Sequence, residues 1–394
     1  MTADERFDVL IVGAGPAGSF AAERLARSGA RVALFDGRPD EEAKACGGGV
    51  TSKALKAWPF LLEAMGRTVD VVEMQAPSGR RVRLSLREPF AIYSRRAFDS
   101  YLRERARAAG AHIFNMRVSA SEGKDERGEW VVRAKTGDGW RGRVLVAADG
   151  ANSAIARRLA GALPKSEMEV AFGYRAPLPK EADAPTLISF LPGWAGYAWA
   201  FPRLDHISFG IATAQDAFDH AALDALLWQF MVDYYGAGQD EERLRQTREE
   251  LRRVAERYAA RIPGLSPETF EKRRVGAEDW ALLGDAAGFA DPVTGEGIYY
   301  ALRSAELFAA AYLAGSPASY EAMWRADFGR ELRRASQMRR RFYGTFYGSP
   351  FTDRMIDFAR WHPGIRRTLC ELVAGDQGYL DLKRTLVRRA LWPR

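Results

Sequence analysis

The chain has few cysteines, few histidines and no long apolar run. Its 394 residues include two cysteines, Cys46 and Cys370, and four histidines. Two isolated cysteines cannot form a disulfide framework, and the scattered histidines lack the spacing of metal ligands. No segment reaches the roughly 18 apolar residues that a membrane-spanning helix needs. These absences exclude a disulfide-rich secreted domain, a zinc protein and an integral membrane protein.

The N-terminal residues lack the basic and apolar regions of a signal peptide. We therefore expect a cytoplasmic protein that contacts a membrane, if at all, peripherally at its inner face. The net charge of +7 comes from residues 330–394, which hold 15 Lys and Arg against 6 Asp and Glu. This excess suits anionic lipid or an acidic electron-transfer protein, and also a solvated helical face. Nucleic acid is not expected, because no binding motif accompanies the charge.

A strand-helix-strand pattern opens the chain. An apolar run at 7–12 is followed by a glycine-rich turn, a helical stretch over 15–28 and a second apolar run at 31–35. This order is typical of a βαβ unit with a parallel sheet. We therefore predict an α/β fold of the Rossmann type for the first part of the chain.

Alternating patterns further along predict a second, antiparallel sheet. Residues 69–76 and 80–86 alternate around a Pro-Ser-Gly turn and predict a hairpin. One broad antiparallel sheet is expected from the strand-like runs at 170–175, 186–190, 197–201 and 207–211. Other strands are expected at 112–119, 129–135, 141–148 and 275–283, and helices at 97–109, 217–260, 297–313 and beyond.

A GxGxxG motif made of Gly13, Gly15 and Gly18 lies between the first strand and the first helix. In such a motif the first glycine permits a tight turn, the second lets the backbone approach a pyrophosphate, and the third lets the helix pack on the strand. Ala17 lies inside the motif. Asp36 ends the second strand, where a carboxylate accepts hydrogen bonds from a ribose, although an Asp-Gly pair also fits a plain turn. The motif predicts a bound adenine dinucleotide.

Two later strands also end at an aspartate. Asp149 follows the run 146–148, and Gly284-Asp285 follows the strand that is expected to end at 283. With the N-terminal motif, these signatures make the chain resemble the FAD-dependent monooxygenase and reductase superfamily typified by p-hydroxybenzoate hydroxylase. The resemblance covers residues 7–313 and implies non-covalently bound FAD. We expect Ala17, Asp149 and Gly284 to be among the residues that bind this cofactor.

The resemblance also implies roles for single residues. Asp285 would bond the ribityl chain of FAD. Gly295, Gly297 and Ile298 would begin a helix whose N–H groups face the flavin and stabilise negative charge on its reduced form. Arg95 matches an arginine that contacts FAD just before a helix, and its neighbour Arg96 fits the same position.

A cysteine followed by three glycines, Cys46 to Gly49, narrows the family. A second segment reads Tyr197-Ala-Trp199-Ala-Phe201-Pro. Together they resemble the geranylgeranyl reductase family, which carries a Cys-Gly segment beside the flavin and a Tyr-x-Trp-x-Phe-Pro signature. The proline that the family places before the tyrosine is here Pro192, with extra residues between. The resemblance implies that Cys46 positions or protonates the substrate, and a small buried hydrophobe is the alternative role.

Strand alternation places Tyr197, Trp199 and Phe201 on one face, where three rings can wall an apolar slot for a polyprenyl chain. An aromatic stripe of this kind also fits a plain core. We assign catalysis to Cys46, Tyr197 and Trp199, and substrate binding to the three aromatic residues. Halogenases carry a Trp-x-Trp-x-Ile-Pro-like stretch instead, and this difference favours a reductase.

The expected fold is α/β: a Rossmann-type FAD-binding domain, an interleaved substrate domain with an antiparallel sheet, and a helical C-terminal extension. The first takes residues 1–68, 92–165 and 270–329, the second 69–91 and 166–269, and the third 330–394. The expected activity is reduction of C=C bonds in a geranylgeranyl-type lipid by hydride from reduced FAD. Electrons would come from NAD(P)H, a ferredoxin or a flavodoxin. A monooxygenase or halogenase acting on an aromatic substrate is the alternative.

Overall fold

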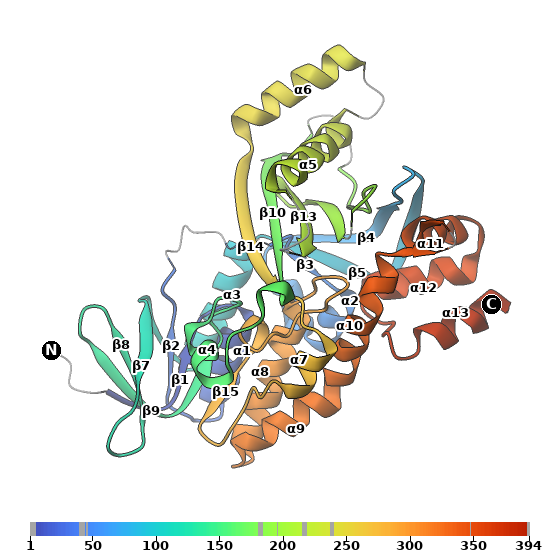
Figure 1. Cartoon of the computed structure of the whole chain (residues 1–394). Coiled ribbons are helices and arrows are strands. Elements are labelled where there is room, and N and C mark those ends of the chain that lie inside the picture. Colours follow the sequence, from blue (N-terminus) through green and yellow to red (C-terminus); the bar gives the residue numbers. More distant parts are fainter. Residues whose placement is uncertain are drawn as a thin grey trace. The chain divides into compact units, whose positions relative to one another are not determined.

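The computed structural model describes residues 5–38, 44, 46–179, 184–194, 196–214, 219–236, 240–346 and 348–391. The chain forms two compact units, and each is assembled from three segments (Figure 1). The first unit comprises Met1–Ala43, Arg96–Pro164 and Ile262–Ser336, and the second comprises Lys44–Arg95, Lys165–Arg261 and Gln337–Arg394.

The first unit contains a seven-stranded sheet of order β6-β2-β1-β9-β8-β7, with β15 also paired to β9. Its strands are β1 (Glu5–Val12), β2 (Val32–Phe35), β6 (His112–Phe114), β7 (Val118–Lys124), β8 (Trp130–Ala134), β9 (Gly139–Ala147) and β15 (Trp280–Leu282). The pairs of β1 with β2 and β9, of β2 with β6 and of β15 with β9 are parallel. Their carboxyl ends therefore meet at one edge of the sheet.

Helices of the first unit flank this sheet. They are α1 (Pro16–Arg27), α3 (Arg95–Ala108), α4 (Ala154–Ala160), α7 (Pro267–Lys272), α8 (Ile298–Leu313) and α9 (Tyr320–Trp324), with short helical turns η3 (Gly284–Ala286), η4 (Pro317–Ser319) and η5 (Arg325–Gly329). Pro16 begins α1, where its missing N–H costs no helical hydrogen bond. The buried Glu23 of α1 is paired with Arg105 of α3 at 2.6 Å, which fixes these two helices together.

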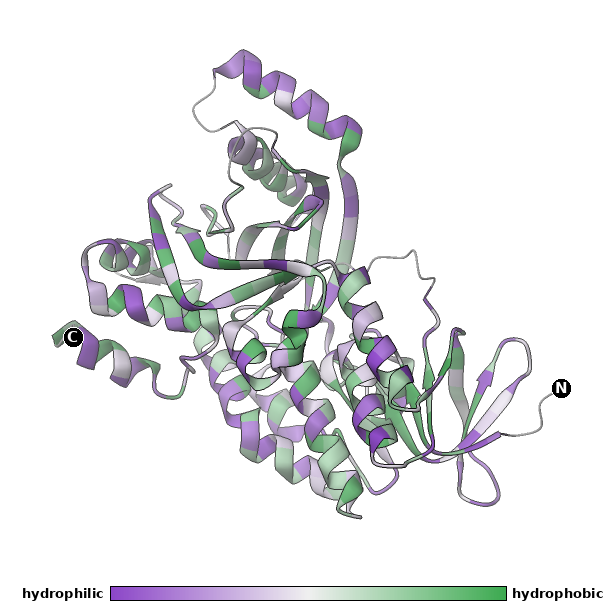
Figure 2. Cartoon of the chain, turned by 180° about the vertical axis from the view of Figure 1, so that it is seen from behind, coloured by the Kyte–Doolittle hydropathy of each residue, from purple (hydrophilic) through white to green (hydrophobic). Residues whose placement is uncertain are grey.

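The second unit is built on an eight-stranded sheet of order β14-β10-β13-β12-β11-β4-β5-β3. Its strands are β3 (Gly49–Val50), β4 (Gly66–Gln75), β5 (Arg81–Tyr93), β10 (Met168–Pro177), β11 (Leu187–Ser189), β12 (Gly196–Pro202), β13 (His206–Ala214) and β14 (Glu256–Pro263). Exposed hydrophilic and buried hydrophobic residues alternate along the first half of β5 (Figure 2), so this part of the sheet has one solvated face.

Helices cover both faces of this second sheet. They are α2 (Ser52–Ala57), α5 (His220–Tyr235), α6 (Glu241–Val254), α11 (Phe351–Trp361), α12 (Pro363–Ala374) and α13 (Leu382–Leu391), with turns η1 (Pro59–Glu63) and η2 (Lys165–Glu167). Helix α10 (Arg330–Phe342) begins in the first unit and ends in the second, before the short hairpin of β16 (Thr345–Phe346) and β17 (Ser349–Pro350). Helix α5 packs on the face that holds Ala198 and Ala200. Helices α11 and α12 pack with Tyr197 on the opposite face.

The structure corrects three expected elements. The segment 217–260 is not helical throughout, because α6 ends at Val254 and β14 follows. This strand lies at the sheet edge, and three of its eight residues are charged, so it lacks the apolar alternation on which a strand prediction depends. The strand predicted at 275–283 is confined to Trp280–Leu282, and the strand predicted at 112–119 is divided into β6 and β7. The hairpin of β4 and β5 and the helices α1, α3 and α8 are confirmed.

Two glycines let aromatic rings lie flat on the second sheet. Gly210 of β13 is the cross-strand neighbour of both Trp199 and Gly173. A Cβ at Gly210 would lie 2.1 Å from the Trp199 ring, and a Cβ at Gly173 would lie 2.7 Å from the Tyr258 hydroxyl. The missing side chains therefore create a trough that the two large rings fill.

Because Trp199 fills this trough, we expect the effects of Gly210→Ala and Trp199→Ala on the free energy of unfolding to depend on each other. Gly210→Ala should lower the free energy of unfolding by about 1–3 kcal/mol, because the added methyl group would overlap the Trp199 ring. Chemical denaturation of G210A, W199A and the double variant measures the effect. The cost of G210A should largely disappear in the W199A background. An equal cost in both backgrounds would mean that the overlap is not its cause.

Candidate active site

Backbone hydrogen bonds connect the four strand ends at the carboxyl edge of the first sheet. Gly13 N–H donates to Phe35 O at 2.8 Å, Ala148 N–H to Val12 O at 2.8 Å, and Leu283 N–H to Ala147 O at 2.9 Å. The bonds run from β2 through β1 and β9 to the end of β15. They bring together the three predicted motifs, which are far apart in the sequence, at the edge where α/β sheets bind ligands.

The three glycines of the first motif have different surroundings. Gly13 has a φ of +104°, and a Cβ there would lie 2.3 Å from the Ala148 carbonyl oxygen. A Cβ at Gly18 would lie 1.8 Å from the Gly13 carbonyl oxygen, so α1 packs directly on the turn. A Cβ at Gly15 would meet no described atom within 4 Å. Gly15 thus leaves a cradle at the start of α1, as the approach of a pyrophosphate requires.

Asp36 is buried at the end of β2, and arginines hold its carboxylate. It accepts from the backbone N–H of Arg38 at 3.2 Å and from Arg103 Nη1 at 3.1 Å. Arg38 also lies 3.5 Å from the carboxylate of Asp99. Its oxygens also accept from Arg38 Nε at 3.3 Å and from Arg38 Nη2 at 3.2 Å, so each carboxylate oxygen already has two donors from the two arginines. A ribose hydroxyl would have to replace one of these bonds. Sequence reasoning missed Arg38 and Arg103, although an arginine two residues after the strand-end aspartate was a visible signal.

The aspartate of the third motif lies at the N-terminus of α8. A Cβ at Gly297 would be 3.2 Å from Asp285 Oδ1, and Gly297 caps α8 without a side-chain hydrogen bond. Asp291 shapes the preceding turn, because its carboxylate accepts from Val293 N–H at 2.7 Å and Thr294 N–H at 3.1 Å. The first N–H groups of α8, including that of Ile298, therefore form a positive helix end beside a carboxylate.

Asp149 and Gly295 complete the turns at this edge. A Cβ at Gly13 would lie 2.7 Å from Asp149 Cα, so the second motif packs on the first. Asp149 itself is exposed at the end of β9. Gly295 has a φ of +68° and donates its N–H to Asp291 O at 2.8 Å, in the turn that leads into α8.

The two candidate arginines before α3 differ in burial. Arg95 is buried, whereas Arg96 is exposed. Burial of a guanidinium requires compensating partners, which favours Arg95 as the residue with a specific role. The side chain of Ala17, by contrast, is buried between helices and touches the space beside Gly284. It acts in the packing of α1.

The cysteine-glycine segment belongs to the second unit and is closely packed there. A Cβ at Gly47 would lie 3.1 Å from Trp199 Nε1, and a Cβ at Gly49 would lie 2.6 Å from the Phe90 ring. Gly48 has a φ of +80°, and its N–H donates to Cys46 Sγ at 3.3 Å. The three glycines therefore let the segment lie directly against aromatic rings, and Cys46 is only partly buried at its start.

Arg203 anchors this segment from the end of β12. Its Nη2 donates to the carbonyl oxygens of Cys46 at 2.7 Å and Gly47 at 3.1 Å. Arg203 is buried, and burial lowers the pKa of its guanidinium, with further lowering by the charges of Arg175 and Arg95. Two carbonyl dipoles thus compensate a desolvated cation, which restrains the backbone of Cys46.

A buried pair of hydroxyl groups, from Ser208 and Tyr258, lies near the Cys46 carbonyl oxygen to which Arg203 donates. Ser208 Oγ lies 2.7 Å from the Tyr258 hydroxyl and 3.5 Å from the Cys46 carbonyl oxygen. The Tyr258 hydroxyl donates to Phe209 O at 2.7 Å. Burial raises the pKa of Tyr258 to about 12, so it stays protonated and keeps this bond. Sequence reasoning missed Arg203, Ser208 and Tyr258, because the residues that they contact are 49 or more positions away in the sequence.

The three predicted aromatic residues share one face of β12. Ring centroids lie 5.9 Å apart for Tyr197 and Trp199, and 6.5 Å apart for Trp199 and Phe201. Trp199 and Phe201 contact the cysteine-glycine segment, whereas Tyr197 packs on the core that contains α11 and α12. The structure therefore brings Trp199 and Phe201 to Cys46, and places Tyr197 at the other end of the aromatic row.

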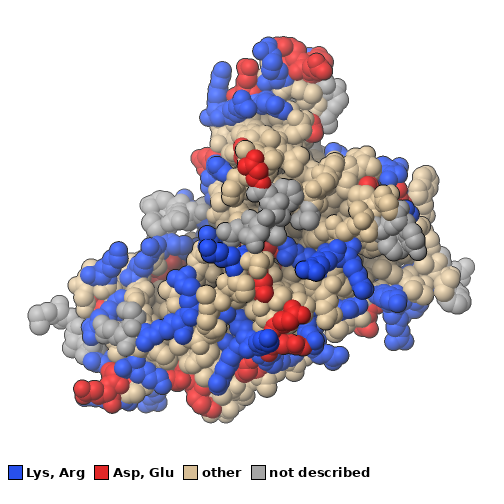
Figure 3. All heavy atoms as spheres, viewed as in Figure 1, with Lys and Arg blue, Asp and Glu red and all other residues tan. Residues whose placement is uncertain are grey.

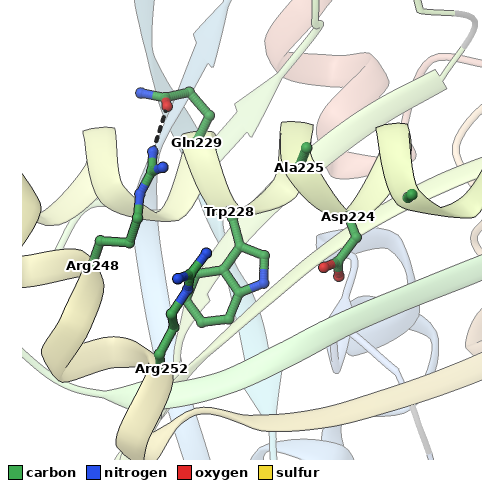
Figure 4. A pocket seen from close by; sticks show the side chains of 7 residues that line it. Asp224, Ala225, Trp228, Gln229, Arg248 and Arg252 are labelled. Atoms are coloured by element: carbon green, nitrogen blue, oxygen red, sulfur yellow. Dashed lines mark hydrogen bonds between the residues drawn. The ribbon is translucent and has the colours of Figure 1, made fainter.

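A separate pocket lies between α5 and α6 (Figure 4). It is lined by Ala221, Asp224, Ala225, Trp228, Gln229, Arg248 and Arg252. Its polar groups bind one another or neighbouring side chains: Arg248 donates to Gln229 at 2.8 Å, and the Tyr174 hydroxyl donates to Asp224 at 2.7 Å. Because α5 covers the sheet face opposite Trp199, this pocket is distinct from the Cys46 segment.

The described residues offer neither a metal site nor a membrane-spanning helix. Among the residues with described positions, no group of three or more His, Cys, Asp or Glu side chains is arranged to hold a metal ion. No helix within the described ranges combines the length and apolar character needed to cross a bilayer.

The glycine geometry predicts two separable effects. Gly15→Ala should leave the fold intact, because the methyl group meets no protein atom, but should weaken FAD binding by about tenfold or more. Gly18→Ala should lower both stability and flavin content, because its Cβ would overlap the Gly13 carbonyl. Flavin titration and thermal unfolding of the apoproteins measure both. An unchanged dissociation constant in G15A would remove Gly15 from the cofactor site.

The chain has relatives over most of its length. The FAD binding domain family matches residues 6–311. Geranylgeranyl diphosphate reductase of Rhodobacter capsulatus is 30% identical over 368 residues, which cover 87% of this chain and 85% of that protein. Digeranylgeranylglycerophospholipid reductase 1 of Methanothermobacter thermautotrophicus is 28% identical over 350 residues, which cover 82% and 84%.

Solved structures share the fold at lower identity. A geranylgeranyl bacteriochlorophyll reductase-like protein from Thermoplasma acidophilum matches with a TM-score of 0.75 and 21% identity, covering 98% of this chain and 100% of that one. A probable FAD-dependent monooxygenase from Pseudomonas aeruginosa matches with a TM-score of 0.60 and 20% identity, covering 86% and 98%. The Gly15 cradle and the open N-terminus of α8 fit FAD. The chain belongs to the geranylgeranyl reductase family and is an FAD-dependent oxidoreductase.

Proposed function

We propose that this enzyme reduces C=C bonds of an isoprenoid chain of the geranylgeranyl type. The observation that carries the proposal is the docking of the cysteine-glycine segment on the aromatic face of β12, with Cys46 held by Arg203. Reductases of geranylgeranyl diphosphate and of a digeranylgeranyl phospholipid are relatives at 28–30% identity. Both relatives are named for a geranylgeranyl chain, but one name gives a diphosphate head group and the other a glycerophospholipid head group.

Residues of the first unit would hold the cofactor. We assign the pyrophosphate to Gly13, Gly15 and Gly18, the ribose to Asp36 and the ribityl chain to Asp285. The N–H groups at Gly297 and Ile298 would face the flavin, and Asp149 and Gly295 would complete the site. Arg95, which ends the Lys44–Arg95 segment of the second unit and begins α3, is assigned to FAD from the resemblance alone. Reduced FAD, when bound, would supply a hydride to one alkene carbon, and a proton would add to the other.

The second unit would supply the apolar surface and the proton. Trp199 and Phe201 are only 5% and 9% exposed, because the cysteine-glycine segment packs on them. An isoprenoid chain bound beside them would meet the rings by apolar contact with water excluded, and the rings would stabilise positive charge that develops on the alkene. Cys46 carries a thiol proton at the border of this surface. Arg203 keeps that residue in place by holding its carbonyl oxygen rather than by touching the thiol. Tyr197 extends the aromatic row.

Electrons for the flavin would come from NAD(P)H or from a ferredoxin or flavodoxin. The described residues contain one glycine motif of the dinucleotide type, at Gly13. A nicotinamide would therefore have to dock without a second domain of that kind. Stopped-flow reduction of the bound flavin by NADH, NADPH and reduced ferredoxin separates these donors.

An anaerobic experiment tests the activity. The flavin of the purified protein is reduced chemically, a geranylgeranyl lipid is added, and flavin reoxidation is followed with mass spectrometry of the lipid. A reductase should reoxidise its flavin and yield a product heavier by two hydrogen atoms for each bond reduced. Substrate-dependent oxygen consumption in air, with no anaerobic reoxidation, would instead indicate a monooxygenase or halogenase.

A matched pair of cysteine variants tests the thiol. Cys46→Ser should lower the rate of anaerobic flavin reoxidation by about 10²-fold, the range for loss of a general acid, with flavin content unchanged. Cys370→Ser is the control, since Cys370 is also a free, partly buried cysteine but lies on α12. Equal rates for C46S, C370S and the unmodified enzyme would exclude Cys46 as the proton source.

A further inference from the structure

Two C-terminal helices expose large apolar side chains. Trp361 and Phe358 of α11 are 81% and 61% exposed, and Leu391 and Val387 of α13 are 66% and 54% exposed. Each pair is spaced by three or four residues, so each forms a stripe on one helix face. Single exposed apolar residues are ordinary, but converging stripes mark a binding surface.

The two stripes meet because the helices are fixed to each other. His362, next to Trp361, lies with Nε2 3.2 Å from Ala390 O, next to Leu391. A Cβ at Gly364 would be 2.5 Å from Arg389 O, so the start of α12 packs directly on the end of α13. Arg389 also donates to Thr368 at 3.1 Å. These contacts bring the end of α11, with Trp361, close to the end of α13, with Leu391. We call the four exposed apolar side chains of the two helix ends the C-terminal patch.

Among the described residues, unpaired positive charge lies beside the α13 part of the C-terminal patch, whereas Asp357 next to Phe358 on α11 is paired with Arg80 at 2.7 Å. Lys383, Arg384 and Arg388 are exposed on α13, and they form no ion pair with any residue whose position is described. Along α13 the order Arg384, Val387, Arg388, Leu391 places cations and apolar side chains on the same face, and Figure 2 shows these alternating bands near the C-terminus. The Arg360 guanidinium lies 5.7 Å from the centre of the Trp361 ring.

Helix α6 is an exposed, charge-rich helix with which α13 can be compared. It carries both signs of charge (Figure 3), and Arg245 pairs with Glu242 at 2.8 Å and with Glu249 at 3.8 Å. Its charges are thus balanced within the helix. Helix α13 contains no acidic residue to pair with its cations. It also exposes the apolar side chains of Val387 and Leu391, whose contact with water is unfavourable.

We infer that the C-terminal patch docks on the surface of an anionic lipid bilayer. Interfacial helices insert Trp, Phe and Leu at the boundary of headgroups and acyl chains, while Lys and Arg contact anionic headgroups. The patch has both components, and its cations complement negative lipid. Docking of this kind is independent of which bond the enzyme reduces, and it would bring the enzyme to a substrate that is itself a lipid.

Flotation with vesicles tests the docking on the full-length, flavin-loaded protein. Binding to phosphatidylcholine vesicles containing phosphatidylglycerol should exceed binding to pure phosphatidylcholine, and added salt should weaken it. Phe358→Ser with Trp361→Ser should lower the bound fraction by about tenfold, because two aromatic side chains no longer enter the interface. Arg384→Glu with Arg388→Glu should lower it by at least about fivefold, and only for anionic vesicles.

Matched controls distinguish the patch from general surface effects. Leu62 and Met65 are 48% and 72% exposed elsewhere in the second unit, so Leu62→Ser with Met65→Ser removes equivalent apolar surface. Arg243→Glu with Arg253→Glu makes the same charge change on α6. Both controls should bind vesicles as the unmodified protein does. Flavin content and circular dichroism verify that every variant is folded.

Three results would overturn the inference. One is an unmodified protein that does not float with anionic vesicles at low salt. Another is that the F358S/W361S variant and the L62S/M65S control bind vesicles to the same extent. The third is loss of a dimer, or loss of reduction by ferredoxin, in the patch variants with vesicle binding unchanged, because the patch would then bind a protein. Chemical reduction and anaerobic reoxidation with detergent-dispersed lipid tests the proposed activity separately.

Discussion

Both units depend on glycines at positions where the backbone lies so close to a neighbouring element that no side chain would fit. In the first unit Gly13 and Gly18 bring a turn, a helix and a neighbouring strand end together. In the second unit Gly47 and Gly49 lay a chain segment against aromatic rings, and Gly210 makes room for one of those rings. A methyl group at any of these positions would separate elements that the candidate sites need in contact.

The two units use this constraint for different chemistry. In the first, the space that glycines leave at Gly15 and Gly297 borders helix N-termini, where partial positive charge favours phosphate and reduced flavin. In the second, the glycines bring Cys46 to an apolar wall, and a desolvated guanidinium at Arg203 holds it there. Charge stabilisation and apolar exclusion of water are thus properties of separate units of the chain.

Sequence reasoning succeeded where the signal is local. The spacing of Gly13, Gly15 and Gly18 and the apolar runs before Asp149 and Asp285 predicted the parallel strand ends, because a strand followed by a glycine turn has a short-range signature. It failed at β14, whose edge position leaves charged residues on a strand, and it could not identify Arg203 or Arg103. The partners of these arginines are 156 or more and 67 residues away. Only the folded register brings them together.

The trough over Gly210 has a consequence for how this family can vary. Because the ring of Trp199 occupies the volume that a side chain at the neighbouring strand position would need, Gly210 cannot gain a side chain while the ring keeps its size. A homologue with alanine at the glycine position should carry a smaller ring at the tryptophan position. The depth of the apolar wall, and with it the bulk of chain that fits against it, would then evolve through paired substitutions rather than single ones.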